Sequence, residues 1–234
     1  MNTFSATLQA IHARINQAKA NVGRNDTIQL CAVSKAQSAE KIRLAYNAGQ
    51  TIFGENYLQE ALSKQALLSD CQIEWHFIGP IQSNKTQPIA QHFAWVHSVD
   101  RLKIAQRLSD ARPLHSAPLN ICLQINSSEE VSKGGASVAE VATLAKDISQ
   151  LPNLKLRGLM AIPAPTKDLA KQHAQFKIVG EIYRDLQQQG FEFDTLSIGM
   201  SEDFEAAIAE GATIVRIGSA IFGERTMQTR KQLE

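Results

Sequence analysis

A lysine at the end of an apolar stretch is the first residue of this sequence that could form a covalent bond with a ligand. Lys35 follows the run Leu30-Cys31-Ala32-Val33-Ser34, which is typical of a buried strand. Beside an apolar wall the charged form of an amine is disfavoured, and a neutral amine is a nucleophile for aldehydes. An isolated lysine at a strand end is usually just solvated, so a role for Lys35 depends on the groups around it.

Two glycine-containing turns in the C-terminal part of the sequence could hold a phosphate. Gly199-Met200-Ser201 follows the apolar segment 195–198, and Gly218-Ser219 follows the segment 213–217. Glycine lets the main chain approach a ligand closely, and main-chain N–H groups at the start of a helix favour an anion. The hydroxyl groups of Ser201 and Ser219 would add two further donors.

Ser201 also has a simpler interpretation as the N-cap of the helix that follows it. Glu202 and Asp203 would then interact with the positive end of the helix dipole. These two acidic side chains would repel a phosphate unless they face outward, and the sequence leaves the two interpretations open.

Arg216 lies within a strand-like run, Ile214-Val215-Arg216-Ile217. A buried guanidinium is costly unless it is paired, and the outer face of a parallel strand is covered by helices. We therefore expect Arg216 to point toward a ligand. His76, in the run Trp75-His76-Phe77-Ile78-Gly79, is equally compatible with a hydrogen-bonded core position and with a pocket position.

The elements that would position these residues alternate along the chain. Strands are predicted at 28–33, 51–53, 73–78, 95–98, 119–125, 155–160, 195–198 and 213–217. Helices are predicted at about 4–22, 39–48, 57–68, 85–91, 101–109, 138–150, 169–189 and 203–210. Eight strand–helix units in 234 residues predict an α/β fold, a single (β/α)8 TIM barrel with an extra N-terminal helix, spanning residues 1–234 as one domain. An open doubly wound sheet is the alternative.

In such a barrel the chemistry gathers where the strands end. Several polar and glycine residues of the sequence fall at such ends, namely Ser34-Lys35, Gly54-Glu55-Asn56, Gly79-Pro80, Asn84-Lys85, Asn126-Ser127, Ala161-Ile162-Pro163, Gly199-Met200-Ser201 and Gly218-Ser219. This coincidence supports the predicted order of the elements.

Composition and motifs exclude several classes of function. The 24 basic and 23 acidic side chains give a net charge of +1, so nucleic-acid or membrane binding is not expected. The histidines and the three isolated cysteines lack metal-ligand spacing, and no Walker loop, Gly-x-Ser-x-Gly turn or dinucleotide fingerprint is present. The unpaired cysteines and the absence of a signal peptide predict a cytoplasmic protein.

Six segments, in order along nearly the whole chain, carry a resemblance to a known family. They are Ala32-Val33-Ser34-Lys35, Phe53-Gly54-Glu55-Asn56-Tyr57, residues 75–85 (WHFIGPIQSNK), residues 156–163 (LRGLMAIP), Gly199-Met200-Ser201-Glu202-Asp203 and residues 215–223 (VRIGSAIFG). Together they resemble the YggS/PROSC family, the pyridoxal 5′-phosphate (PLP) homeostasis proteins, which are similar to the barrel domain of alanine racemase.

The resemblance implies a cofactor, PLP, and a role for each site residue. It implies that Lys35 forms a Schiff base with PLP, that Ser201, Gly218 and Ser219 hold the phosphate, and that Arg216 faces the pyridine nitrogen. Asn56 matches a family position near the cofactor. One departure is that the family often continues Val-Ser-Lys with Thr-Lys-Pro, whereas this chain has Ala36-Gln37-Ser38, so a second lysine is missing.

The expected role is carriage and delivery of PLP in PLP homeostasis, without strong catalysis. An arginine cannot keep the pyridine nitrogen protonated as an acid would, and the second domain that supplies a tyrosine base in the resembling racemases has no counterpart after the last barrel motif. We expect a monomer that makes transient contact with PLP-dependent apo-enzymes. The alternatives are a PLP-dependent amino-acid racemase-like enzyme and a barrel enzyme acting on another phosphorylated substrate.

Overall fold

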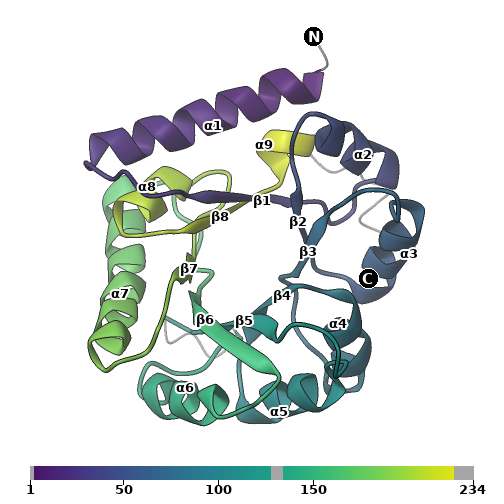
Figure 1. Ribbon diagram of the computed structural model, residues 1–234. Helices are drawn as coiled ribbons and strands as arrows, with labels where there is room; N and C mark the ends of the chain where they lie inside the picture. The colour runs from purple at the N-terminus through teal and green to yellow at the C-terminus, as the bar shows by residue number, and fades with distance from the viewer. Residues whose placement is uncertain (1–2, 128–133, 224–234) are drawn as a thin grey trace.

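Eight short strands close into a parallel barrel in the computed structural model of the chain, which describes residues 3–127 and 134–223 (Figure 1). The strands are β1 (Gln29–Val33), β2 (Ile52–Glu55), β3 (Glu74–Phe77), β4 (Trp95–Val99), β5 (Leu119–Gln124), β6 (Leu154–Met160), β7 (Thr195–Ser197) and β8 (Ile214–Ile217). Their order in the barrel follows the chain, and β1 pairs with β8 to close it. The predicted TIM barrel is therefore confirmed, and the open sheet is excluded.

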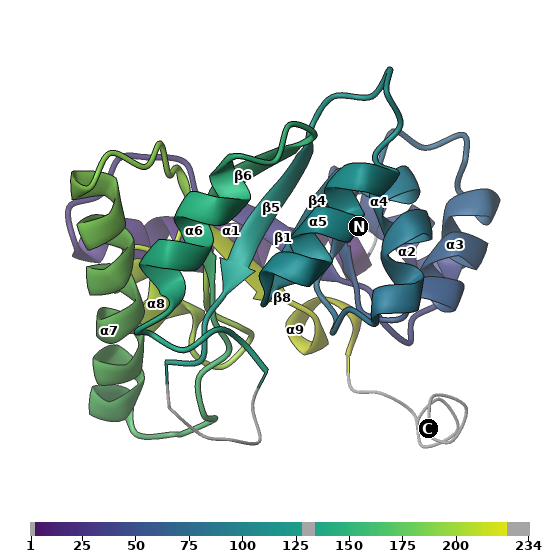
Figure 2. The ribbon, with the colours of Figure 1, turned by 90° about the horizontal axis from the view of Figure 1, so that it is seen from below.

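Helices cover the outside of the barrel, as the alternation in the sequence predicts. They are α1 (Thr3–Asn21), α2 (Ala39–Asn47), α3 (Leu58–Leu67), α4 (Thr86–His92), α5 (Leu102–Ala111), α6 (Val141–Ser149), α7 (Leu169–Gln188), α8 (Phe204–Ala209) and α9 (Ser219–Phe222), with a 3-10 turn, η1 (Ser83–Lys85), before α4. The sequence did not predict η1 and α9, because segments of three and four residues are too short to show a helical period. In Figure 2 the helices surround the strands, and α9 lies at the edge of the barrel next to β8.

The predicted N-terminal helix, α1, lies outside the closed barrel. Its apolar positions Leu8, Ile11, Ile15 and Ala18 are buried at helical spacing, as predicted. The helix crosses α8 and α9 (Figure 1), and the rings of Phe4 and Phe222 lie 5.9 Å apart. The fifth predicted position, Val22, lies beyond the end of the helix and is exposed. Thus α1 joins the start of the described chain to its last elements.

Polar groups occupy the middle of the barrel, where branched aliphatic side chains usually lie. His76, His97, Ser197 and Arg216 are all buried and belong to β3, β4, β7 and β8. A hydrogen bond joins His97 to Ser197, although β4 and β7 are not neighbours in the barrel. These side chains therefore meet across the interior, directly beneath the strand ends.

None of the helices among residues 3–127 and 134–223 has the length and apolar character that crossing a bilayer requires.

Candidate cofactor site

A cavity of about 310 Å³ opens at the C-terminal ends of the strands. All six residues singled out in the sequence line it, namely Lys35, Asn56, Ser201, Arg216, Gly218 and Ser219. They come from the ends of β1, β2, β7 and β8, so the closed barrel brings together residues from the first and last quarters of the chain. Other strand-end residues of interest, Asn84, Lys85, Asn126 and Ser127, are not among the described residues that line this cavity.

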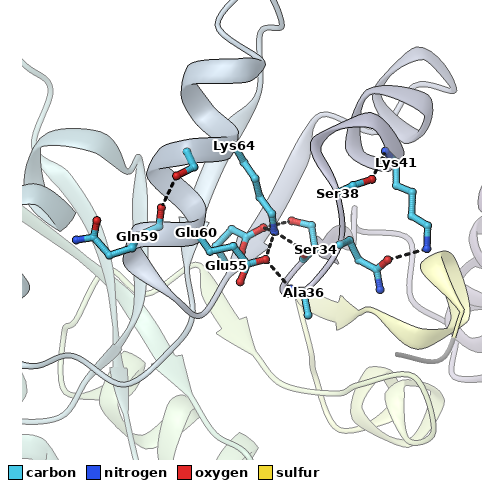
Figure 3. Close-up of polar contacts among 10 residues, drawn as sticks. Ser34, Ala36, Ser38, Lys41, Glu55, Gln59, Glu60 and Lys64 are labelled. Carbon is cyan, nitrogen blue, oxygen red and sulfur yellow. Dashed lines mark hydrogen bonds and ion pairs between the residues drawn. The ribbon is translucent and has the colours of Figure 1, made fainter. Parts of the chain in front are cut away.

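The main chain on both sides of Lys35 is held by a buried ionic group (Figure 3). Lys64 of α3 donates a hydrogen bond of 2.7 Å to the carbonyl oxygen of Ser34. On the other side, the Ala36 N–H donates to Glu60 over 2.7 Å. Ala36 has a φ of 61°, the one positive φ of a non-glycine residue in the described part of the chain. The side chain of Lys35 thus enters the cavity from a turn that is fixed before and after it.

Ser34, Glu55, Glu60 and Lys64 form what we call the Lys64 cluster. The Lys64 ammonium lies 2.7 Å from Glu55 and 2.5 Å from Glu60, and Ser34 donates its hydroxyl to Glu55 over 2.6 Å. The side chain of Glu55 is fully buried and that of Lys64 is 6% exposed. Burial raises the pKa of Glu55, against the opposing effect of Lys64. One buried cation therefore holds two carboxylates beneath the turn that carries Lys35.

Asn56 is placed by the end of β2 and by a close contact with the next strand end. A Cβ atom on Gly79 would lie 2.2 Å from the carbonyl oxygen of Asn56, so only glycine allows this approach. The side-chain oxygen of Asn56 is buried and has no hydrogen-bond partner in the structure. A buried acceptor of this kind is costly unless a bound ligand supplies a donor.

The turn that carries Ser201 differs in one respect from the sequence prediction. Gly199 has a φ of 91°, which suits glycine, and the Met200 N–H donates to the Asp203 carboxylate. The helix α8 begins only at Phe204, with Asp203 at its N-cap. The alternative in which Ser201 is an ordinary N-cap is therefore wrong. The helix starts later because Asp203 folds back onto the turn.

The two acidic residues that follow Ser201 differ in their exposure and in their hydrogen bonds. Glu202 is exposed, whereas Asp203 is half-buried and is occupied by the Met200 N–H. Burial raises the pKa of Asp203, with Arg216 acting in the opposite direction. Both residues line the cavity, so a phosphate would lie near them, and Asp203 already takes up one main-chain donor of the turn, the Met200 N–H.

The second predicted phosphate-binding turn, Gly218-Ser219, leads from β8 directly into α9. A Cβ atom on Gly218 would lie 3.1 Å from the carbonyl oxygen of Val33 at the end of β1. A larger residue would therefore press on the strand that carries Lys35. Ser219 is exposed at the rim of the cavity.

Arg216 is buried to within 4% of its surface and is held by neutral acceptors. Its guanidinium donates to the carbonyl oxygen of Ser197, to the hydroxyl of Ser197 (2.6 Å) and to the carbonyl oxygen of Ala161 (3.0 Å). These bonds use three of the five N–H groups of an arginine. Burial lowers the pKa of Arg216 from its ordinary value. An arginine nevertheless stays protonated in a protein, so Arg216 keeps its positive charge and has two N–H groups left at the base of the cavity.

Comparison with known proteins places this site in a family. The model of the alanine racemase N-terminal domain matches residues 6–226. A pyridoxal phosphate homeostasis protein of Pseudomonas aeruginosa is 57% identical over 226 residues, which cover 96% of this chain and 97% of the relative. The chain belongs to the pyridoxal phosphate homeostasis protein family. Another member, from Escherichia coli K12, is 47% identical over 229 residues, covering 96% and 98% of the two chains. The family predicted from the sequence is thereby confirmed.

Solved structures agree with this family membership. PipY of Synechococcus elongatus, whose structure was solved with PLP bound, is 36% identical, with a TM-score of 0.84 and coverage of 94% of this chain and all of PipY. An alanine racemase from Clostridium difficile has a TM-score of 0.76 at 15% identity, which shows a shared fold. This chain aligns with only 60% of that racemase.

Several buried residues around the family site were not singled out from the sequence. The spacing of Glu60 and Lys64, four residues apart on α3, is a signal for an ion pair, but an exposed one. Ser197 and His97 occupy the inward positions of short strands, which the alternation of a barrel strand could have indicated. Their contact across the barrel has no signal in the sequence.

Proposed function

We propose that this protein binds PLP reversibly as a Schiff base on Lys35 and acts as a carrier that delivers PLP within PLP homeostasis. In this proposal Ser201, Gly218 and Ser219 hold the phosphate, Arg216 faces the pyridine nitrogen, and Asn56 contacts the cofactor. The observation that carries the proposal is that all six of these residues line one cavity. A relative with 36% identity, PipY, was solved with PLP bound, which supports the same ligand here.

The chemistry of the cavity fits PLP. Arg216 has N–H groups left for a ring nitrogen that accepts a hydrogen bond, and the buried oxygen of Asn56 lacks a donor. The turns after β7 and β8 present glycines and hydroxyls at the usual phosphate position of such barrels. When bound, PLP supplies an aldehyde, and the protein supplies an amine at Lys35, an anion site and a fixed cation.

The residues around the cavity support carriage more than catalysis. Besides Lys35, the ionisable side chains among its described lining are Glu202, Asp203 and Arg216. Asp203 is occupied by a main-chain N–H, and Arg216 is too weak an acid to exchange a proton with a ring nitrogen at neutral pH. A racemase needs an acid–base group on each face of the substrate. We therefore favour binding and release, in the cytoplasm and as a monomer, through transient contact with PLP-dependent apo-enzymes.

The binding proposal is tested by absorbance and chemical trapping. Purified protein mixed with PLP is expected to develop the visible absorbance of a Schiff base, and borohydride is expected to fix the pyridoxyl group on Lys35, as peptide mass spectrometry would show. Lys35→Ala is expected to lose both signals. Lys41→Ala, which changes an exposed lysine of α2, is the matched control and is expected to retain them. A wild-type protein that stays colourless after addition of PLP would overturn the proposal.

The carrier role is separated from a racemase-like activity by two further measurements. Loaded protein is expected to activate an apo-enzyme faster than the same concentration of free PLP in the presence of a PLP scavenger. Interconversion of D- and L-alanine is expected to stay near the background rate. Turnover at rates of roughly 1 per second or more, which is ordinary for enzymes, would contradict the carrier role.

A further inference from the structure

A series of hydrogen-bonded side chains crosses the barrel from Arg216 to the end opposite the cavity. The Arg216 guanidinium contacts the Ser197 hydroxyl, which lies 2.8 Å from Nδ1 of His97. Nε2 of His97 lies 2.9 Å from Nδ1 of His76, and Nε2 of His76 lies 2.8 Å from Glu74. We call Glu74, His76, His97 and Ser197 the interior network.

The interior network is buried everywhere except at its far end. His76, His97 and Ser197 are completely inaccessible to solvent, whereas the Glu74 side chain is 44% exposed. Glu74 is the first residue of β3 and the cavity lies where the parallel strands end. The network therefore runs from a solvent-exposed carboxylate, at the end of the barrel where the strands begin, to the base of the cavity, where they end.

Each hydrogen bond of the interior network is donated in the direction from Arg216 toward Glu74. The ionised carboxylate of Glu74 can only accept, so Nε2 of His76 carries a proton and donates to it, and Nδ1 of a neutral His76 accepts from Nε2 of His97. Nδ1 of a neutral His97 then accepts from the Ser197 hydroxyl, which itself accepts from Arg216. This assignment requires both rings to be neutral. Burial lowers the pKa of His76 and lowers that of His97 further, which agrees with neutral rings.

This arrangement gives Arg216 a remote counter-charge in addition to the nearby Asp203. The pKa of Glu74 is lowered, chiefly by its hydrogen bond to His76, so its carboxylate is ionised at neutral pH. Aligned hydrogen bonds polarise one another in a buried environment. The negative end of the network thus offsets part of the arginine charge without neutralising it at the cavity.

We propose that the interior network is a positioning device, which fixes Arg216 and sets the strength of its charge toward the cavity through Glu74. This inference rests on the proposed function, in which Arg216 faces the pyridine nitrogen of PLP. A stronger field from Arg216 makes that nitrogen a weaker base and lowers the pH at which a Schiff base on Lys35 loses its proton.

Other charged and titratable groups lie near Arg216 and Glu74, and the substitutions that test the proposal leave them all in place. Cys31 of β1, Cys122 of β5 and Asp203 surround Arg216, and burial raises the pKa of each thiol to about 12, so both stay neutral. Arg157 acts on Glu74 from β6. None of these residues is changed in the substitutions below.

The test compares Glu74→Gln, Ser197→Ala and the double variant. Ser109→Ala, which removes a buried serine of α5 outside the network, is the matched control for loss of a hydroxyl. Each single network variant is expected to weaken PLP binding about two- to thirtyfold, the range that residues acting at a distance produce. Each is also expected to lower the midpoint of the pH titration of the bound-PLP absorbance. The control is expected to shift neither.

The double variant decides whether the effect travels through the network. Once Ser197→Ala has cut the connection, Glu74→Gln is expected to add nothing further to the shift. Additive shifts, or single variants that bind PLP with an unchanged midpoint, would overturn the proposal.

A measurement on the protein without PLP separates this proposal from the proposed function. Nitrogen-15 NMR of the imidazole rings is expected to show protonated Nε2 and unprotonated Nδ1 in both His76 and His97, with the His97 signal displaced in Glu74→Gln. A protonated Nδ1 on His97 would overturn the network even if PLP binds. The expected ring signals in a protein that does not bind PLP would leave the network intact and remove the proposed function.

Discussion

Lys35 and Arg216 face the same cavity but are held in different ways. The protein fixes Lys35 through its neighbours, since the Lys64 cluster binds the main chain at Ser34 and Ala36 through the side chains of Lys64 and Glu60. It fixes Arg216 through the side chain itself, with carbonyl oxygens and a hydroxyl. We call the Lys64 cluster the clamp, because it holds the main chain with ionic side chains. We call the acceptors of Arg216, which belong to Ser197 and Ala161, the cradle, because neutral groups surround a charged side chain.

The difference agrees with the roles proposed for the two residues. A lysine that forms a covalent bond with a ligand has to be held in place at the cavity, and the contacts of the Lys64 cluster do so through the turn that carries it. An arginine that presents a permanent charge can be gripped by its own N–H groups, provided that the grip does not neutralise it. The two regions are therefore expected to respond differently when their support is removed.

The largest difference is expected when Lys64 is replaced by methionine. This substitution leaves the buried Glu55 and the partly exposed Glu60 without their cation, and removing one partner of a buried ion pair costs about 3–5 kcal/mol of unfolding free energy. Chemical denaturation measures the loss, and Lys41→Met is the control, with little expected change. Lys64→Met combined with Glu55→Gln is expected to recover part of the loss. A loss below about 1 kcal/mol, the size typical of a surface ion pair, would refute the description of this cluster as a clamp.

The pH dependence of stability is expected to separate the two regions by its sign. The pKa values of His76 and His97 lie below their ordinary value of 6.5, so below that pH the unfolded chain binds protons that the folded protein excludes. Stability is therefore lost as the pH falls below 6.5, by up to about 1.4 kcal/mol per pH unit for each histidine. Glu55 acts oppositely, because its raised pKa adds stability as the pH falls through its folded pKa toward 4.5.

Denaturation between pH 7.5 and 5.0 tests these signs. His97→Asn is expected to flatten the decrease below pH 6.5, whereas Glu55→Gln is expected to make the loss toward pH 5 steeper. A wild-type stability that is constant across this range would contradict the assignment of two neutral buried histidines.

A smaller effect on folding is expected for Arg216→Met. The substitution removes three hydrogen bonds but also removes a buried charge, and these contributions offset each other to within about 1 kcal/mol. PLP binding, followed by absorbance, is expected to weaken strongly in the same protein. A loss of stability as large as that of Lys64→Met would show that the cradle supports the fold rather than the cavity.

The smallest effect is expected at Ala36, within the clamped turn. Its φ of 61° costs about 1–2 kcal/mol for a residue with a Cβ atom, while glycine adds about 0.4–1 kcal/mol of entropy to the unfolded chain. Ala36→Gly is therefore expected to stabilise the protein by roughly 0.5 kcal/mol. Ala10→Gly in the exposed middle of α1 is the control and is expected to destabilise by about 1 kcal/mol. A destabilised Ala36→Gly would mean that the turn is not strained.

The same contrast explains how much the sequence could predict. Lys35 and Arg216 were identified because each stands out from an apolar strand. The strand-end rule placed Lys35 at the mouth of the barrel, and the cost of burying an unpaired charge directed Arg216 toward a ligand there. The Lys64 cluster was not identified from the sequence, because a lysine in a helix is normally expected to face solvent. Its burial depends on how α3 packs against β1. The interior network depends on the diameter of the closed barrel and on side-chain rotamers, which no local pattern encodes.

The boundaries of the elements show a similar limit. Gly49, Gly190 and Gly211 have positive φ values just after α2, α7 and α8, where glycine commonly ends a helix. The predicted start of α8 lies within one residue of the observed one, but the N-cap is Asp203 and not Ser201, because the Asp203 side chain accepts from the Met200 N–H in a contact that the sequence pattern does not show. Local signals therefore fix most helix ends, and tertiary contacts decide the rest.

The pairing of β1 with β8 has a consequence for folding during synthesis on the ribosome. Lys35 is made early, but β8, Arg216 and the turn at Gly218 follow only after most of the chain, which takes on the order of ten seconds or more at roughly 5–20 residues per second. Throughout that interval β1 has an open edge, and the cavity has no wall on that side. Under the proposed function, a nascent chain would therefore lack a complete PLP site, and only the closed barrel would bind PLP.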